Sequence, residues 1–371
     1  MKLMIQPEGG IQPILSALQK AKKSIQILIF RYDRSEIERA LVEAVQRGVL
    51  VQALIAFTNR GEEKNLRKLE MRLLERGITV TRTADDLVRY HGKMFIIDRK
   101  ELYLLAFNYT HLDITLSRSF GAVITDRKTV DEAVKLFECD AHRVPYTATV
   151  HDLVVSPVNA RKELTEFIRG AKKQLLIYEM KISDPDFIKL LLHKMVEGVD
   201  VRILGRAAPK SNQLQTRVMH MRLHARVIIR DGKQAFVGSQ SLRKLELEAR
   251  REIGVIFRDV AAVRKLEEIF EQDWSKSKPM MGTMESAIEI PVRRVAKLVS
   301  KHVNVKPVIE QMLERLMERS SNDVPFEPDE VANIVRDAFR DEVHDAVVIA
   351  LRDMAANATL LSGEAAEDDD G

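Results

Sequence analysis

The sequence contains one short string twice, and this internal repeat constrains the fold more than any other feature. His91-Gly92-Lys93 is followed by Asp98, and His224-Ala225-Arg226 is followed by Asp231, so both strings read H-x-[KR]-x4-D. Flanking segments repeat at matching places: 21–27 with 171–177, 47–51 with 197–201, and 136–138 with 269–271. The pattern predicts two copies of one structural unit, over residues 1–150 and 151–275.

Each copy has the same expected order of helices and strands. The elements that precede each motif are a helix, a short apolar strand, an amphipathic helix and a second strand, at 11–22, 25–30, 35–47 and 49–56 and at 160–172, 175–178, 184–197 and 199–204. Ser35 and Asp184 are expected to cap the amphipathic helices, and Gly48 and Gly198 to end them. Because strands alternate with helices, we expect an α/β sandwich in each half.

The character of the chain changes after Trp274, where residues 275–279 are expected to form a linker. Amphipathic helical patterns at 290–302, 306–319 and 328–354 predict a helical appendage over residues 279–360. The acidic stretch 361–371 predicts a disordered tail. We expect the appendage to serve packing or oligomerisation, so that the protein could form a homo-oligomer through these helices.

Composition sets only broad limits on partners and location. The net charge of +4 allows an anionic partner without requiring one. The single cysteine, Cys139, rules out an internal disulfide and fits a reducing compartment. No run of eighteen apolar residues and no apolar core of a signal peptide is present. We expect a cytoplasmic protein, with peripheral membrane contact through an amphipathic helix as an open possibility.

The two motifs carry the groups that covalent cleavage of a phosphate ester requires. Alternation along a strand places His91 with Lys93, and His224 with Arg226, on one face. One imidazole could attack phosphorus, the other could protonate the leaving oxygen, and the cations could hold phosphate oxygens. The remaining histidines share no spacing, so no metal site is expected.

Further site residues follow each motif. Asn108, Ser239 and Ser241 are expected on a neighbouring strand, where they could bind a phosphate oxygen. Asp98 and Asp231 are counted among the catalytic residues, with a structural role in turns as an equally weighted alternative.

This layout resembles the phospholipase D superfamily, whose repeat is H-x-K-x4-D followed by G-S-x-N. The resemblance covers residues 1–275 and implies two pseudo-symmetric α/β sandwich halves whose motifs form one active site. It also implies a phosphohistidine intermediate and neither a metal nor another cofactor. The sequence departs from the pattern where Arg226 replaces lysine, where the first half lacks Gly-Ser but keeps Asn108, and where Ser241 replaces asparagine.

The resemblance further implies a downstream carboxylate that orients a histidine. Glu252 stands at that place after His224, and the matching position after His91 is Ser119. We therefore expect Glu252 to orient His224, and His91 to lack such a partner unless another carboxylate such as Asp113 serves it. An oriented imidazole is the better nucleophile, which favours His224, whereas the family pattern favours His91. Both assignments stay open at this point.

These features predict an enzyme that hydrolyses phosphodiesters or transfers phosphatidyl groups on phospholipids, as phospholipase D or cardiolipin synthase does. Two alternatives remain. One is a nuclease of the same superfamily acting on DNA or RNA, which the mild basic charge supports weakly and the 5% of aromatic residues does not favour. The other is a degenerate, non-catalytic protein that binds phosphate-bearing ligands.

Overall fold

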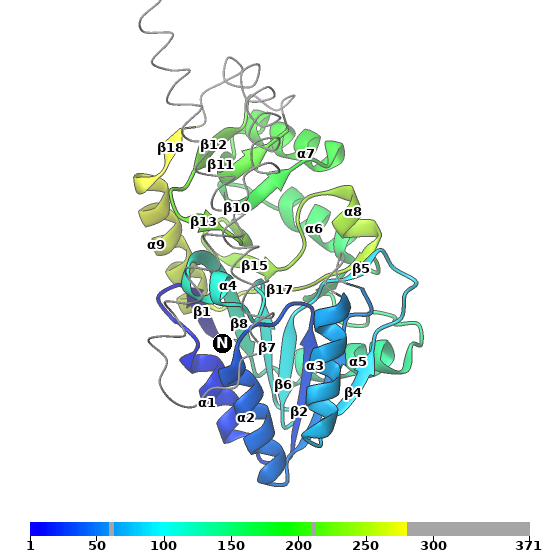
Figure 1. Cartoon of the computed structure of the whole chain (residues 1–371). Helices are drawn as coiled ribbons and strands as arrows, with labels where there is room; N and C mark the ends of the chain where they lie inside the picture. The colour runs from blue at the N-terminus through cyan, green and yellow to red at the C-terminus, as the bar shows by residue number, and fades with distance from the viewer. Residues whose placement is uncertain (59–62, 209–212, 280–371) are drawn as a thin grey trace, which may run out of the picture. The chain divides into compact units, whose positions relative to one another are not determined.

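The computed structural model describes residues 1–58, 63–208 and 213–279 (Figure 1). The expected appendage over 279–360, apart from its first residue, and the acidic tail over 361–371 lie outside the described residues. Residues Met1–Met280 form one unit, so the two copies of the repeat are halves of a single structure.

The first half is built on a mixed sheet with strand order β1-β8-β7-β6-β2-β3-β4. Its elements are β1 (Lys2–Gln6), α1 (Gln12–Lys20), β2 (Ser24–Ile29), α2 (Ser35–Gln46), β3 (Leu50–Ile55), α3 (Glu63–Glu75), β4 (Thr79–Arg82), β5 (Arg89–Tyr90), β6 (Met94–Ile97), β7 (Glu101–Leu105), α4 (His111–Thr115), β8 (Ser117–Ile124) and α5 (Arg127–His142). Strands β2, β3 and β4 are parallel, whereas β6, β7, β8 and β1 pair antiparallel.

The second half repeats this plan with the strand order β18-β12-β11-β10-β14-β15-β17-β9. Its elements are β9 (Leu153–Val155), α6 (Ala160–Arg169), β10 (Gln174–Ile182), α7 (Pro185–Val196), β11 (Asp200–Ala207), β12 (Gln215–Val218), β13 (Arg222–Leu223), β14 (Arg226–Arg230), β15 (Gln234–Gly238), α8 (Lys244–Glu248), β16 (Arg250–Arg251), β17 (Ile253–Phe257), α9 (Val260–Lys276) and β18 (Lys278–Pro279). The expected α/β architecture of two similar halves is confirmed.

Local sequence signals explain most of these boundaries. Asp184 caps α7 by accepting hydrogen bonds from the second and third N–H groups of the helix, with Pro185 at its first position. Ser35 is instead the first residue of α2, and Arg34 occupies the N-cap position without a side-chain capping hydrogen bond. Gly48 and Gly198 follow their helices at φ of 83° and 85°, a region that other residues rarely adopt.

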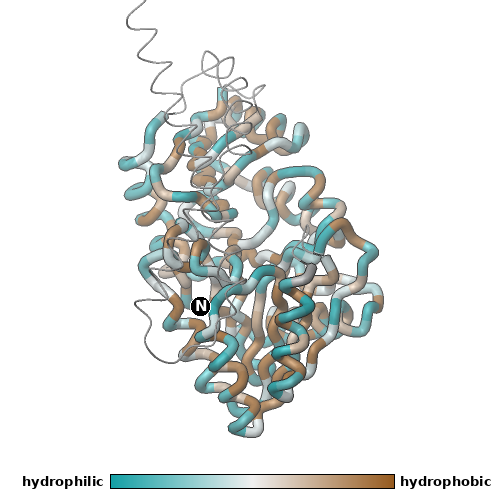
Figure 2. Tube along the Cα trace, viewed as in Figure 1, coloured by the Kyte–Doolittle hydropathy of each residue, from teal (hydrophilic) through white to brown (hydrophobic). Residues whose placement is uncertain are grey.

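The hydrophobic core has a shared centre and two outer parts. The inner faces of both sheets pack together with α5 and α9, and Leu104, Phe120, Tyr178 and Val237 belong to this shared cluster. Separate clusters lie under α1, α2 and α3 of the first half and under α6 and α7 of the second. Figure 2 shows the hydrophobic stretches concentrated along the central strands and the hydrophilic ones on outer helices and loops. The shared centre holds the two halves in one arrangement.

Two short strand pairs cross between the halves, and each leads directly into a motif histidine. β5 of the first half pairs in parallel with β16 of the second, and β13 of the second half pairs in parallel with β8 of the first. The backbone N–H of His91 donates to the carbonyl of Arg251 at 2.8 Å, and that of His224 donates to Arg118 at 3.0 Å. Each histidine is therefore fixed by the backbone of the opposite half.

Asp98 and Asp231 lie at the opposite ends of their strands from the histidines. Each carboxylate accepts hydrogen bonds from three successive backbone N–H groups, those of Lys22, Lys23 and Ser24 or those of Lys172, Lys173 and Gln174. Asp98 follows Lys93 by five residue steps along an extended strand, which corresponds to about 16 Å. The structure shows the turn role that was the alternative expectation, at the ends of the strands away from the histidines, and a catalytic role for Asp98 and Asp231 stays a prediction.

Candidate active site

The two motif histidines each contact a carboxylate that belongs to the opposite half. His91 Nδ1 is hydrogen-bonded to Glu252 Oε2 at 2.9 Å. His224 Nδ1 lies 3.1 Å from Asp113 Oδ2, a charge contact without hydrogen-bond geometry. The expectation that Glu252 orients His224 is therefore wrong. The strand pairs between the halves explain why Glu252 contacts His91 and not His224, because Glu252 directly follows β16, which pairs with β5 beside His91.

The carboxylates do not occupy equivalent positions of the repeat. Glu252 corresponds to Ser119, as the sequence indicated, and Asp113 corresponds to Glu246. The carboxylate of Glu246 also acts on His91, where it opposes the fall in the pKa of that imidazole. The Oγ atom of Ser119 is buried, and no hydrogen-bond partner for it is found in the described part of the chain. The two histidines thus have unequal surroundings.

Both motif cations are buried at the same site. The Lys93 side chain is fully buried, and its Nζ lies 2.9 Å from His91 Nε2. Arg226 is 3% exposed and donates from Nε to Ser241 Oγ at 3.1 Å. One terminal nitrogen of Arg226 is buried without a hydrogen-bond partner among residues 1–58, 63–208 and 213–279. That nitrogen is a donor that an anion could satisfy.

The three expected phosphate-binding residues also lie here, but each is engaged with the protein. Asn108 donates from Nδ2 to Asp113 at 2.6 Å, and the hydroxyl of Ser241 accepts from Arg226. The hydroxyl of Ser239 accepts from the backbone N–H of Ile253 at 3.0 Å. These contacts orient Asp113, Arg226 and the start of β17, whereas a direct contact of the three residues with substrate stays a prediction.

The sequence of the chain matches a known protein family. The model of the family described as cardiolipin synthase, PLD-like domain, matches residues 14–141 and 164–274. The chain belongs to the phospholipase D-like family. Its two matched segments fall one in each half, and each contains one H-x-[KR] motif.

Individual relatives differ in what they are named for. A polyphosphate kinase of Pseudomonas aeruginosa is 24% identical over 225 residues, which are 55% of this chain and 32% of that protein. A phospholipase D of Rickettsia typhi is 33% identical over 106 residues, 28% of this chain and 49% of the relative. The crystal structure of polyphosphate kinase from Porphyromonas gingivalis has a TM-score of 0.64 at 19% identity, covering 75% of this chain and 48% of that one. The chain thus spans about half of these relatives or less, and the structural likeness concerns the fold.

Burial controls the protonation of the phospholipase D-like site. Desolvation lowers the pKa of His91 well below its usual value, with Lys93 adding to the effect. Desolvation also lowers the pKa of His224 to about 4, although Asp113 opposes the shift. Burial favours the protonated form of Asp113, but His224 and Arg222 outweigh burial and hold the pKa of this carboxyl well below its usual range. Both imidazoles are therefore neutral at neutral pH, which is the form that a nitrogen nucleophile needs.

Several residues of the phospholipase D-like site escaped the sequence analysis. Arg222 donates to Asp113 Oδ1 at 2.7 Å, and Arg250 donates to Glu246 Oε1 at 3.1 Å. Asp113 was considered only as a partner for His91, and it contacts His224 instead. A usable signal existed, since Asp113 and Glu246 are carboxylates at equivalent positions of the repeat.

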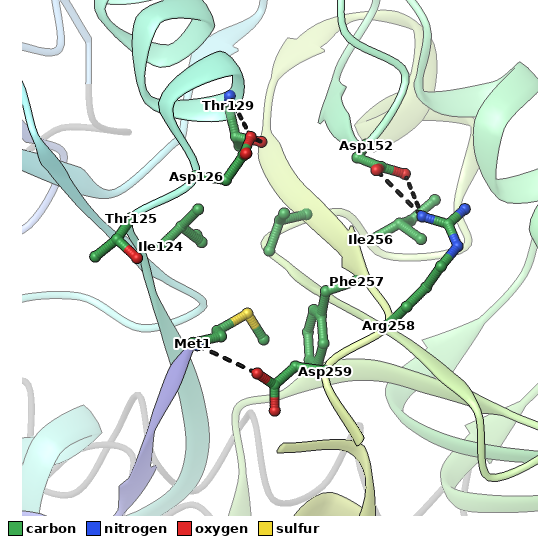
Figure 3. A pocket seen from close by; sticks show the side chains of 11 residues that line it. Met1, Ile124, Thr125, Asp126, Thr129, Asp152, Ile256, Phe257, Arg258 and Asp259 are labelled. Atoms are coloured by element: carbon green, nitrogen blue, oxygen red, sulfur yellow. Dashed lines mark hydrogen bonds and ion pairs between the residues drawn. The ribbon is translucent and has the colours of Figure 1, made fainter. Parts of the chain in front are cut away.

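A cavity of about 400 Å³ lies away from the histidines (Figure 3). Residues at the far ends of β8 and β17 line it, among them Ile124, Asp126, Phe257 and Asp259. Ser119 and Glu252 stand at the opposite ends of the same two strands, so this cavity is not part of the phospholipase D-like site.

The described residues contain neither a metal-ion cluster nor a membrane-spanning helix. No cluster of three or more His, Cys, Asp or Glu side chains suited to a metal ion occurs among them. None of the helices in residues 1–58, 63–208 and 213–279 has the length and apolar character that a membrane crossing requires.

Proposed function

We propose that the protein breaks a P–O bond by covalent catalysis and transfers the phosphorus-bearing group through a phosphohistidine. The observation that carries this proposal is a shared site of two neutral imidazoles, in which Lys93, Arg226 and His224 all act electrostatically on His91, and each imidazole lies beside a carboxylate of the opposite half. A neutral imidazole can attack phosphorus, and buried cations can stabilise the charge that develops on the phosphate oxygens.

His91 is the proposed nucleophile. Its Nδ1 is hydrogen-bonded to Glu252, which places the ring proton there and leaves the lone pair on Nε2. Attack by Nε2 forms an N–P bond while the bond from phosphorus to the leaving oxygen breaks. Lys93 Nζ, 2.9 Å from Nε2, is placed to hold a phosphate oxygen beside the attacking atom. This assignment agrees with the usual pattern of the family.

His224 is the proposed acid and base. It gives a proton to the leaving oxygen in the first step and takes one from the acceptor hydroxyl or phosphate in the second. Ionised Asp113, 3.1 Å from Nδ1, stabilises the imidazolium form that donates. The pKa of His224 is about 4 in the free protein, and a bound phosphate anion beside Arg226 would raise it, so that His224 takes up the proton it donates when the substrate binds.

For the substrate, we propose a phosphoanhydride such as inorganic polyphosphate or a nucleoside triphosphate. The polyphosphate kinase relative supports this class, because its match extends over 225 residues of the chain. Burial supports it as well, since His91 is 8% and His224 6% exposed, and such restricted access favours a slender chain of phosphates over a bulky substrate.

Phospholipid is the second candidate, as the sequence analysis expected. The family match, the phospholipase D relative and a set of exposed apolar side chains favour it. These side chains occupy equivalent positions of the two halves beside the site: Val88 with Met221, and Leu112 with Leu245. Such a pattern beside buried cations would suit a substrate with an acyl chain.

Labelled donors test the proposal and separate the candidates. The protein is incubated with [γ-³²P]ATP, ³²P-polyphosphate, ³²P-phosphatidylglycerol or ³²P-DNA, and the washed protein is assayed for label that is acid-labile and alkali-stable. We expect label from ATP or polyphosphate, and none in His91→Gln. Label from the lipid alone would move the conclusion to phosphatidyl transfer, and label from DNA alone to the nuclease. A folded protein that takes no label and forms no product from any donor would overturn the proposal.

A further inference from the structure

Behind the phosphate-binding cation of the second half lies a buried carboxylate that the mechanism does not use. Glu179 of β10 is 2% exposed and stands directly opposite Arg226 of β14 in the antiparallel pairing. In the first half, the same register continued by one step places Ile29 of β2 opposite Lys93. Arg226 therefore stands opposite the acidic Glu179, whereas Lys93 stands opposite the aliphatic Ile29.

The contacts of Glu179 link it to the turn that holds Arg226. Its Oε2 accepts from the backbone N–H of Leu242 at 3.1 Å, and its Oε1 accepts from Lys181 N–H at 3.2 Å. Leu242 follows Ser241, whose hydroxyl accepts from Nε of Arg226. The carboxylate thus fixes the segment that in turn fixes the guanidinium.

The two cations differ in what burial requires of them. Desolvation lowers the pKa of Lys93 to about 7, so this lysine can lose its charge when no anion is bound. Arginine keeps its charge at any accessible pH, and a buried permanent charge needs a compensating one. Desolvation raises the pKa of Glu179 to about 7, with Arg226 favouring its ionised form and Glu246 opposing it.

We propose that Glu179 is a positioning residue that acts with Arg226 as one unit. Its carboxylate compensates the guanidinium and holds the Ser241–Leu242 turn, so that one nitrogen of Arg226 stays available for an anion. In the first half Lys93 needs no compensating carboxylate, because it can lose its charge, and the aliphatic Ile29 stands opposite it. The inference rests on the proposed function only in that Arg226 faces the phosphate, and its test needs no turnover.

An exchange between the halves tests the unit. Glu179→Ile, Arg226→Lys and the double variant are compared with the wild type at one pH. Two quantities are measured: the midpoint of thermal unfolding and the affinity for inorganic sulfate, a tetrahedral anion, by calorimetry. Glu132→Gln serves as the control, because Glu132 is a buried carboxylate of α5 that is bonded to Tyr146 and Thr149 away from the site.

Glu179→Ile alone should lower the unfolding midpoint and weaken sulfate binding by about tenfold or more, since the guanidinium loses its support and turns toward Glu246. The double variant, which copies the first half, should bind sulfate with an affinity within about twofold of that of Arg226→Lys. Its unfolding midpoint should return to that of Arg226→Lys. The control should leave sulfate binding unchanged.

Additive losses in the double variant would overturn the proposal, because Glu179 would then act independently of Arg226. A Glu179→Ile protein with unchanged sulfate affinity would also overturn it. If Glu179→Ile does not fold, Glu179→Gln, which keeps the acceptor oxygen, is compared with and without Arg226→Lys in the same way. If the wild type forms no phosphoenzyme while the double variant recovers sulfate binding, the proposed function is refuted and the coupling of Glu179 with Arg226 stands.

Discussion

The first and second halves share a scaffold, but they contribute different chemistry to the common site. Each half begins its motif with a strand that pairs across to the other half, and each supplies a carboxylate to the other half's histidine. The cations differ, with a lysine beside an aliphatic residue in one half and an arginine beside an acid in the other. The comparison indicates that duplication set the positions of the groups, whereas the local surroundings divided their roles.

The shared scaffold includes a pair of equivalent buried ion pairs. Arg118 donates from Nε to Asp273 at 2.8 Å, and Arg251 donates from its terminal nitrogen to Asp140 at 3.0 Å. Both pairs join one half to the other, and the backbone carbonyls of the same arginines hold the N–H groups of His224 and His91. Breaking such a buried pair would disturb the histidine of the opposite half as well as the fold.

The largest difference between the halves should appear when the histidines are exchanged for glutamine. Each variant should lose about a thousandfold or more of turnover, because one step loses its nucleophile and the other its proton donor. Only His91→Gln should fail to take up ³²P from a labelled donor, whereas His224→Gln should take up label slowly and release it slowly, because it keeps the nucleophile and loses the acid and base of both steps. The opposite pattern of labelling would transfer the nucleophile to His224.

The crossed carboxylates should show the next largest effect. Glu252→Gln should slow formation of the phosphoenzyme about a hundredfold, and Asp113→Asn should slow both its formation and its breakdown, because His224 is the acid of the first step and the base of the second. Rapid-quench measurement of each step separates the two. Ser119→Ala, at the position equivalent to Glu252, should leave both steps within about twofold, since the hydroxyl of Ser119 makes no hydrogen bond among the described residues. Breakdown at the wild-type rate in Asp113→Asn would contradict the division of roles.

The carboxylate exchange marks the limit of what the sequence could predict. The repeat and the alternation of apolar residues predicted the two α/β halves, because both signals are local. The partners of His91 and His224 depend on two-residue strand pairs between the halves, which leave no periodic trace. Glu179 did leave a trace, as a charged residue at the end of the buried run Leu175–Tyr178, but its partner Arg226 is distant in sequence.

The two cations should differ in how they affect stability. The pKa of Lys93 is about 7 in the folded protein and 10.5 when unfolded, so burial costs stability fully below pH 7 and progressively less up to about pH 10. Lys93→Met should therefore abolish activity while raising the free energy of unfolding by on the order of 3 kcal/mol at pH 6. Urea unfolding at pH 6 and pH 9 measures this.

The gain from Lys93→Met should be smaller at pH 9 than at pH 6. Arg226→Met should instead destabilise the protein at pH 9, because ionised Glu179 would lose its opposite charge, and less at pH 6, where Glu179, with a pKa of about 7, is mostly protonated. Equal effects of the two substitutions would show that the cations are equivalent after all.

The smallest effects should come from the positions where the halves are alike. Asp98 and Asp231 each accept three backbone N–H groups at a turn, with φ of 54° and 55°. Substitution by alanine at either position should cost about 1–2 kcal/mol of unfolding free energy, since the turn loses its acceptor and alanine tolerates positive φ poorly. Asparagine, which tolerates this conformation and keeps one acceptor oxygen, should recover most of the loss.

Turnover of the folded variants should stay within about twofold of the wild type, because the extended strand holds these carboxylates about 16 Å from the site. A turnover loss as large as that of the histidine variants would return Asp98 and Asp231 to the catalytic residues.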